Sequence, residues 1–172
     1  ANGIIGTDLA VKAAPDGYTL VLVASSLATN PTLVKQLPYD TQRDLAPVTM
    51  VGSTPLILAA YPGLAATTVT ELVALAKARP GQLNYASSGN GSPANLAGAL
   101  LNFMAGINLV HVAYKGTAQA TTDVLGGHVQ LSFDAFAKAA IDAGRLKAIA
   151  TTGPKRDPRF PDVPAIAERY PG

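Results

Sequence analysis

The sequence predicts an α/β fold, because helical and strand-like segments alternate along the chain with short connections between them. From residue 68 to residue 152 the order is helix then strand, four times over. Hydrophobic residues make up 48% of the 172 residues and charged residues only 14%, a balance that supports a real core and argues against disorder. We therefore expect a parallel sheet with helices on both faces.

The first 67 residues are less regular than the rest. A short helix is expected over Ile5–Ala14, and the apolar, β-branched run Tyr18–Ala24 predicts a buried strand. Pro31–Leu37 is typical of a short helix that Pro38 closes. Val48–Tyr61 is apolar but interrupted by Gly, Ser and Pro, and it predicts two strands, or one strand that changes partners.

The alternating part of the chain supplies the predicted layers. Apolar residues at helical spacing follow a capping Thr68, and Pro-Gly ends that helix. The expected helices are Thr68–Arg79, Pro93–Gly106, Thr117–Leu125 and Phe136–Ala143, with a short one at Ala165–Tyr170. The expected strands are Leu83–Ala86, Leu109–Tyr114, His128–Phe133 and Leu146–Thr151.

Polar loops follow three of these strands, at Ser87–Ser92, Tyr114–Thr117 and Asp134–Ala135. Ligands of parallel sheets bind beyond the carboxyl ends of the strands, so we expect these loops along one edge. In the first loop, Ser92-Pro93 is typical of an N-cap followed by proline at the first helical position. Such a corner offers backbone N–H groups and the positive end of a helix dipole, which together favour an anion.

The other two loops allow a structural and a functional interpretation. Lys115 either contacts an acidic ligand or is simply solvated, Gly116 permits close approach of the backbone, and Thr117 suits an N-cap. Asp134 either caps the helix that follows or accepts a hydrogen bond from a ligand.

Composition excludes several classes of function. The chain has no cysteine and only two histidines, so we expect no disulfide and no metal site. Thirteen basic and eleven acidic residues form no basic stripe, which argues against nucleic acid. No apolar run is long enough for membrane insertion. Gly89-Asn90-Gly91 does not match a dinucleotide fingerprint, and we expect no cofactor.

Catalysis has little support. A triad of Ser88, His111 and Asp134 is conceivable, but His111 lies in an alternating strand pattern and favours packing against the sheet. No catalytic residue is therefore assigned.

Motifs along the whole chain carry a family resemblance. They are AAPDGYTL at 13–20, NPTLVKQLPYD at 30–40, LNYASSGNGS at 83–92, VAYKGTAQATTDVLGGHVQLSFD at 112–134, AGRLKAIATT at 143–152 and FPDVPAIAE at 160–168. With this set of motifs the chain resembles the substrate-binding receptors of tripartite tricarboxylate transporters, also called the Bordetella uptake family, which are similar to type II periplasmic binding proteins.

The resemblance implies a periplasmic receptor with no chemistry of its own. Two lobes would close on a small organic acid or amino acid, which membrane permease subunits of the transporter then take up. Residues 1–52 would form part of the first lobe with the hinge region, 53–152 a nearly complete second lobe, and 153–172 a return segment toward the first. The chain would thus be an internal fragment.

The resemblance also implies which residues contact the ligand. A loop at Ser25–Asn30 would face the corners of the second lobe. The expected ligand-binding residues are Ser26, Asn30, Ser88, Gly89, Asn90, Gly91, Ser92, Tyr114, Lys115, Gly116, Thr117 and Asp134. Two alternatives stay open: an enzyme acting on small acidic substrates in the same cleft, and a sensory protein that contacts a kinase ectodomain.

Overall fold

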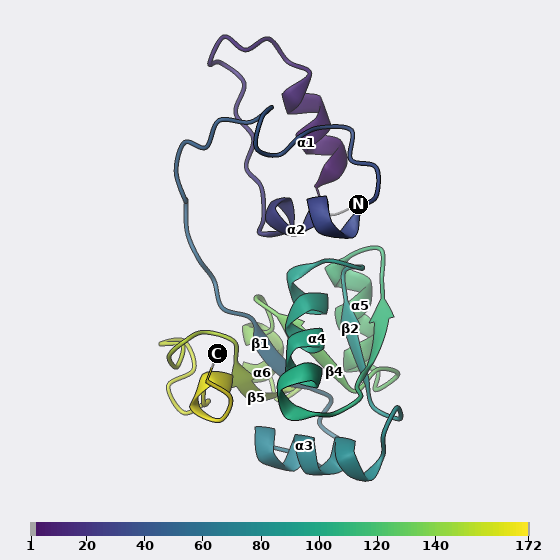
Figure 1. Cartoon of the computed structure of the whole chain (residues 1–172). Coiled ribbons are helices and arrows are strands. Elements are labelled where there is room, and N and C mark those ends of the chain that lie inside the picture. The colour runs from purple at the N-terminus through teal and green to yellow at the C-terminus, as the bar shows by residue number, and fades with distance from the viewer. Residues whose placement is uncertain (1–2, 172) are drawn as a thin grey trace. The chain divides into compact units, whose positions relative to one another are not determined.

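A computed structural model describes residues 3–171, and its chain divides into two compact units (Figure 1). The first unit comprises residues 1–52 together with 91–93, and the second comprises residues 53–90 and 94–172. Each unit is considered separately below.

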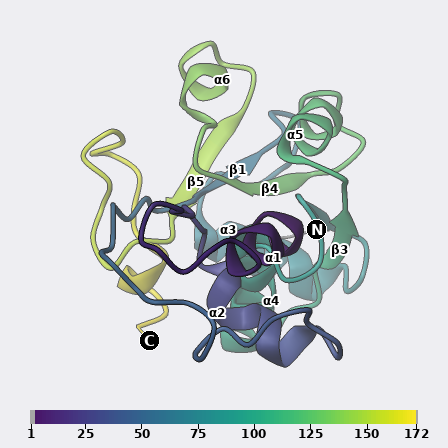
Figure 2. The same ribbon diagram turned by 90° about the horizontal axis from the view of Figure 1, so that it is seen from above.

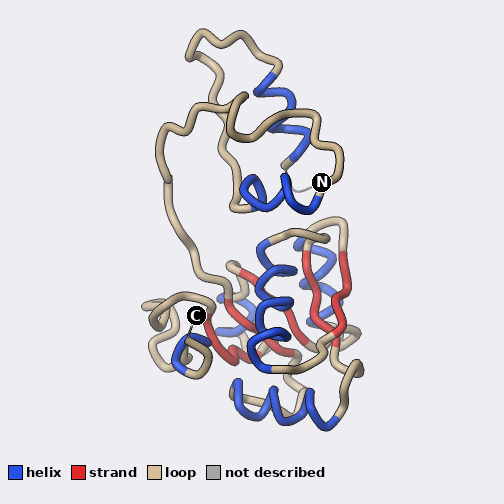
Figure 3. Tube along the Cα trace, in the orientation of Figure 1, coloured by secondary structure: helices blue, strands red, loops and turns tan. Residues whose placement is uncertain are grey.

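The first unit contains two short helices, α1 (Ile4–Val11) and α2 (Ser26–Leu33), joined by long loops. The predicted strand at Tyr18–Ala24 is wrong: these residues form a loop, and no strand of the described chain pairs with them (Figure 3). Tyr18 is 92% exposed, and Leu20 and Leu22 are exposed as well. A β-branched, apolar run favours extended backbone, but a strand also requires a partner for its N–H and C=O groups.

The helix α2 begins earlier than the sequence predicts. We expected a helix over Pro31–Leu37, whereas α2 starts at Ser26 and contains Pro31 in its second turn. The proline removes one backbone donor, and a helix of only eight residues tolerates this because few of its bonds are lost. The residues expected to form a loop at 25–30 are therefore helical.

The second unit is built on a five-stranded sheet with the order β3-β2-β4-β1-β5. Its strands are β1 (Ile57–Ala60), β2 (Asn84–Ser87), β3 (Val110–Ala113), β4 (Leu131–Asp134) and β5 (Lys147–Thr151). The α/β fold class is confirmed, but the sheet is mixed rather than purely parallel.

The mixed character comes from a single strand. β2 pairs in parallel with β3 and with β4, whereas β1 lies antiparallel between β4 and β5. The four strands of the alternating region thus share one direction, as predicted. Of the long apolar run Val48–Tyr61, only β1 forms a strand, and Val48 to Val51 are exposed.

Helices cover both faces of this sheet, as predicted (Figure 2). The helices α3 (Val69–Ala78) and α4 (Pro93–Ala105) pack on one face, with Leu72 and Leu101 among their buried residues. The helices α5 (Thr117–Leu125) and α6 (Lys138–Asp142) pack on the other face through Val124 and their alanines. Side chains of β2 therefore alternate between two cores, Tyr85 facing the first and Ala86 the second.

The last segment, residues 152–171, also belongs to the second unit. The Thr151 N–H donates to the Pro164 carbonyl at 2.9 Å, and Thr151 forms an isolated parallel bridge with Ala165. The short helix expected at Ala165–Tyr170 is only a 3-10 turn, Ile166–Glu168.

Candidate ligand-binding edge

Three loops begin at one edge of the sheet of the second unit, because β3, β2 and β4 are adjacent and parallel. The loop after β2 leads into α4, the loop after β3 leads into α5, and the loop after β4 leads toward α6. The Tyr114 N–H donates to the Ser87 carbonyl at 2.9 Å, which carries the β2–β3 ladder to the start of the loops. This is the edge where the sequence places the candidate site.

The loop after β2 depends on two glycines. Gly89 and Gly91 have φ angles of 130° and 73°, which residues with a side chain rarely adopt. Pro93 is the first residue of α4, as predicted, and the expected capping role of the preceding Ser92 stays a prediction. The corner thus brings the start of a 13-residue helix to the edge.

One backbone donor of this loop is already occupied. The Gly89 N–H donates to the Ser87 hydroxyl oxygen at 3.0 Å, so it is not available to an anion. The Ser88 side chain, by contrast, is half-buried and makes no hydrogen bond within the described residues. The Gly89 N–H is thus engaged within the loop, while the role of Ser88 as a ligand contact stays a prediction.

The sequence did not predict the contact between Ser87 and His111 beneath this loop. Ser87 is 2% exposed, and its hydroxyl oxygen lies 2.6 Å from Nε2 of His111 on β3. The His111 ring also lies against Tyr85, with centroids 5.0 Å apart, so the prediction that it packs on the sheet is confirmed. Burial lowers the pKa of His111. The strand periodicity could have indicated this contact, because Tyr85 and Ser87 are two residues apart on β2 and therefore share a face of the sheet.

The corner after β3 presents a second helix start. Gly116 is the N-cap of α5, and no side chain bonds to the helix there, so the predicted capping role of Thr117 is wrong. Thr117 is instead the first helical residue, and α5 spans Thr117–Leu125, the range that the sequence predicts for this helix. Thr117 and Lys115 are both exposed. An uncapped helix start beside a lysine favours a negative charge.

Tyr114 contributes its backbone to the edge and its side chain to the fold. The ring packs with the core beneath α5 and α6, and its hydroxyl donates to the Asp123 carboxylate on α5. Burial, and then the bond and charge of Asp123, raise the pKa of Tyr114 to about 12. The phenol is therefore committed as a donor within the protein.

Asp134 has structural partners on both carboxylate oxygens. It is 7% exposed, accepts the Phe136 N–H at 2.8 Å, and lies 3.2 Å from the Thr121 hydroxyl of α5. Its predicted role as the helix cap is wrong, because α6 starts only at Lys138 and Ala137 precedes it. The short side chain bonds instead to the N–H two residues on, a turn typical of aspartate.

The conceivable triad is not assembled in the described residues. His111 bonds to Ser87 rather than to Ser88, and Asp134 bonds to Thr121 and Phe136. The serine that His111 does contact, Ser87, is 2% exposed, and its hydroxyl is also bonded to both the N–H and the carbonyl of Gly89.

The two predicted site residues of the first unit lie on α2. Ser26 and Asn30 are four residues apart in this helix, so they share one of its faces. The expectation that they belong to a loop is wrong. Both side chains are buried, and their role as ligand contacts stays a prediction.

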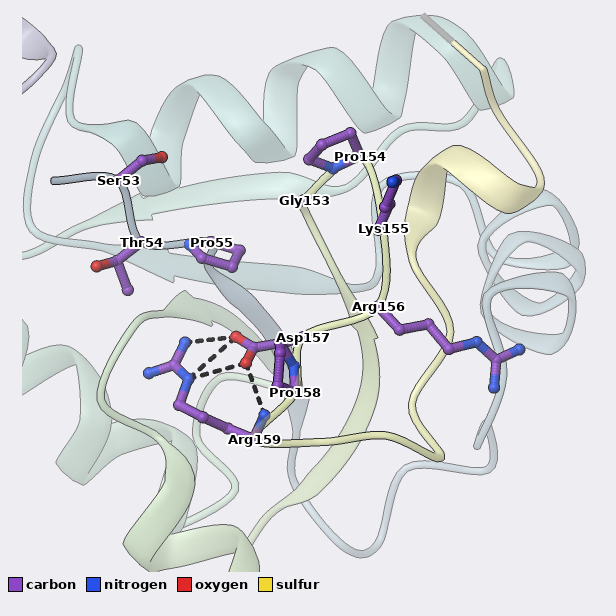
Figure 4. Close-up of a pocket in the computed structure, with 10 residues that line it drawn as sticks. All are labelled: Ser53, Thr54, Pro55, Gly153, Pro154, Lys155, Arg156, Asp157, Pro158 and Arg159. Carbon is purple, nitrogen blue, oxygen red and sulfur yellow. Dashed lines mark hydrogen bonds and ion pairs between the residues drawn. The ribbon is translucent and has the colours of Figure 1, made fainter.

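A surface pocket lies elsewhere in the second unit (Figure 4). It is lined by Ser53–Pro55 and by the segment Gly153–Arg159. Its Asp157 carboxylate is held by the Arg159 guanidinium at 2.6 Å, which lowers the pKa of Asp157. Lys155 and Arg156 also line the pocket, and the Arg156 guanidinium pairs with the Glu168 carboxylate at 2.8 Å.

Within residues 3–171, no three metal-ligating side chains gather as a candidate metal site. Nor does any helix in this range combine the length and apolar character needed to cross a membrane.

The fold and this edge define an α/β binding protein. Its whole sequence, residues 1–172, matches the model of the tripartite tricarboxylate transporter family receptor, so the chain belongs to that family. It is 40% identical to Protein BugT of Bordetella pertussis over 172 residues, which cover 98% of this chain and 53% of BugT. The resemblance seen in the motifs is thus confirmed, and the family is one of receptors and not of enzymes.

Solved structures agree with the fold. A Rhodopseudomonas palustris protein, Rpa4515 with adipate, superposes with a TM-score of 0.91 at 32% identity, over 99% of this chain and 58% of that one. MatC of Rhodopseudomonas palustris with bound malate gives 0.83 at 28% identity, over 99% and 59%. The chain therefore spans little more than half the length of the relatives that it matches.

Proposed function

We propose that this chain is the ligand-binding part of a periplasmic solute receptor that captures a small dicarboxylate for uptake by a permease. The observation that carries the proposal is the pair of helix starts, α4 and α5, which follow two adjacent parallel strands at one edge. Family membership supports the receptor role, and two relatives with similar folds are described with adipate and with malate.

The ligand class follows from the groups at this edge. Two helix starts and Lys115 each favour negative charge, and they lie on neighbouring connections. Accessible hydroxyls at Ser88 and Thr117 add donors that suit a carboxylate oxygen. A ligand with two carboxylates uses more of these groups than one with a single carboxylate, and an uncharged ligand uses none of the dipole field.

The proposal includes the site and the lobes that the family resemblance implies. In the second lobe, residues 53–152, the contacts come from the loops at 88–92 and 114–117. Ser26 and Asn30 serve as contacts from the first lobe, within residues 1–52, and residues 153–172 return toward it. Delivery to membrane permease subunits, and a periplasmic location, are the parts of the proposal that rest on family membership alone.

Calorimetry with matched ligands tests the proposal. Adipate and malate are titrated into the chain, and adipamide, the uncharged diamide of adipate, is the control. A hydrogen bond to a charged group contributes roughly 1.5–3 kcal/mol, so adipate is expected to bind at least about tenfold more tightly than adipamide. Equal affinities for the acid and its diamide, or binding of neither dicarboxylate, would contradict the proposal.

A further inference from the structure

We propose that Ser87 and His111 are positioning residues that hold the loop after β2 in its ligand-binding shape before any ligand arrives. That the loop binds a ligand rests on the proposed function, whereas the hydrogen bonds that hold the loop do not depend on it. We call these contacts the Ser87–His111 clamp. The Ser87 hydroxyl accepts a hydrogen bond from the Gly89 N–H, donates one to the Gly89 carbonyl, and is bonded to Nε2 of His111.

The sheet register brings the two side chains together. Tyr85 pairs with His111 and Ser87 pairs with Ala113 across the parallel β2–β3 ladder. Residues two apart on a strand point to the same face, so Tyr85 and Ser87 both face the side where His111 lies. The tilted contact between the Tyr85 and His111 rings then sets the imidazole against Ser87.

The bonds at the Ser87 hydroxyl determine the direction of each proton. The Gly89 N–H donates to this oxygen at 3.0 Å, and the Gly89 carbonyl, which only accepts, also lies 3.0 Å away. A hydroxyl has one proton and two lone pairs. If that proton goes to the Gly89 carbonyl, the second lone pair is free to accept, and His111 donates through Nε2–H. All three contacts are then satisfied at once.

The clamp acts where the backbone needs support. Gly89 has a φ of 130°, and glycine adopts many backbone conformations at little cost, so contacts from outside the residue select one of them. Both the N–H and the carbonyl of Gly89 are bonded to one buried side chain, which fixes the peptide units on each side. The following residues, Asn90 to Ser92, leave this fixed point toward the start of α4. His111 therefore orients the corner without contacting the ligand.

Nuclear magnetic resonance of the ligand-free chain tests the clamp directly. The variants are His111→Phe, which keeps a ring against Tyr85 but removes the donor, and His111→Gln, which restores an N–H donor. Ser87→Ala removes the acceptor, and Ser132→Ala is its matched control, a buried serine on the neighbouring β4. The readouts are the exchange rate of the Gly89 amide with water and the tautomer of His111.

We expect the exchange of the Gly89 amide to rise about fivefold in His111→Phe and Ser87→Ala, the effect of losing one ordinary hydrogen bond. His111→Gln and Ser132→Ala are expected to stay within about twofold of the parent. The parent His111 is expected to carry its proton on Nε2. Unchanged exchange in both loss variants, or a proton on Nδ1 alone, would overturn the clamp.

A second readout connects the clamp with ligand binding. Adipate affinity is expected to fall in His111→Phe and to recover in His111→Gln. Equal affinity for the parent and His111→Phe overturns the positioning role. If the parent binds no dicarboxylate, the proposed function fails, while the exchange rate of Gly89 still decides whether the clamp exists.

Discussion

At the scale of single residues, the candidate edge contains polar groups of two kinds. Tyr114 and Asp134 are engaged with α5, and Ser87 is engaged with its own loop and with His111. Ser88 and Lys115 stay accessible to a ligand. The sequence could indicate which polar types gather at the strand ends, but not which of them are already paired. That distinction depends on strand register and on the face from which a helix packs.

Tyr114 offers a titration that tests its pairing. Its pKa of about 12 lies above the usual value for tyrosine, because burial and Asp123 favour the neutral phenol. The stabilisation is therefore complete below about pH 10 and is lost as the pH rises through 12. In an ultraviolet titration, the difference between the parent and Tyr114→Phe isolates this group.

Asp123→Asn is the matched change for that titration. It removes the negative charge but keeps a side chain that accepts a hydrogen bond, so the pKa of Tyr114 is expected to fall toward its usual value. A Tyr114 that ionises near pH 10 in the parent, or that is indifferent to Asp123→Asn, would show that the hydroxyl is not held as described.

At the scale of helices and strands, local sequence patterns predicted an element correctly where that element packs against others. α3 starts after Thr68, whose side chain accepts the Glu71 N–H, and α4 starts at its proline. Strands of the second unit are confirmed because both faces of the sheet are covered. Tyr18–Ala24 has the same apolar, β-branched character but no partner strand among the described residues, and it stays unpaired. The antiparallel direction of β1 could not be predicted either, since its partner strands β4 and β5 lie more than 70 residues further along the chain.

The packing of α4 on β2 depends on one glycine. A Cβ at Gly98 would lie 2.2 Å from the Tyr85 ring, which is itself buried among the core residues and hydrogen-bonded to Asn95. Gly98→Ala is therefore expected to destabilise the second unit by about 1–3 kcal/mol, the usual cost of overpacking. Urea unfolding, followed by the fluorescence of the tyrosines, measures this loss.

Gly6→Ala is the control for that substitution. Gly6 also lies inside a helix, but a Cβ added there would meet nothing within 4 Å. Alanine favours helix more than glycine does, so this variant is expected to be as stable as the parent or slightly more stable. If Gly98→Ala behaves like Gly6→Ala, the close contact between α4 and the Tyr85 ring is not the constraint that we describe.

At the scale of the whole molecule, the sequence predicted the α/β class, the strand-end edge and the family. The edge was predictable because co-directional strands place their carboxyl ends together, whatever the order of the strands in the sheet. The clamp of Ser87 and His111 was not, because it needs the register that pairs Tyr85 with His111. The lobe assignment and the set of ligand contacts stay predictions.

The central claim is that this edge, rather than another surface, receives the ligand. Titration of the isotopically labelled chain with adipate, followed by backbone amide shifts, tests it most directly. The largest shifts are expected in the loops at 88–92 and 115–117, with little change around the pocket lined by Gly153–Arg159. Shifts that concentrate at that pocket, or that leave both loops unchanged at saturation, would contradict the account.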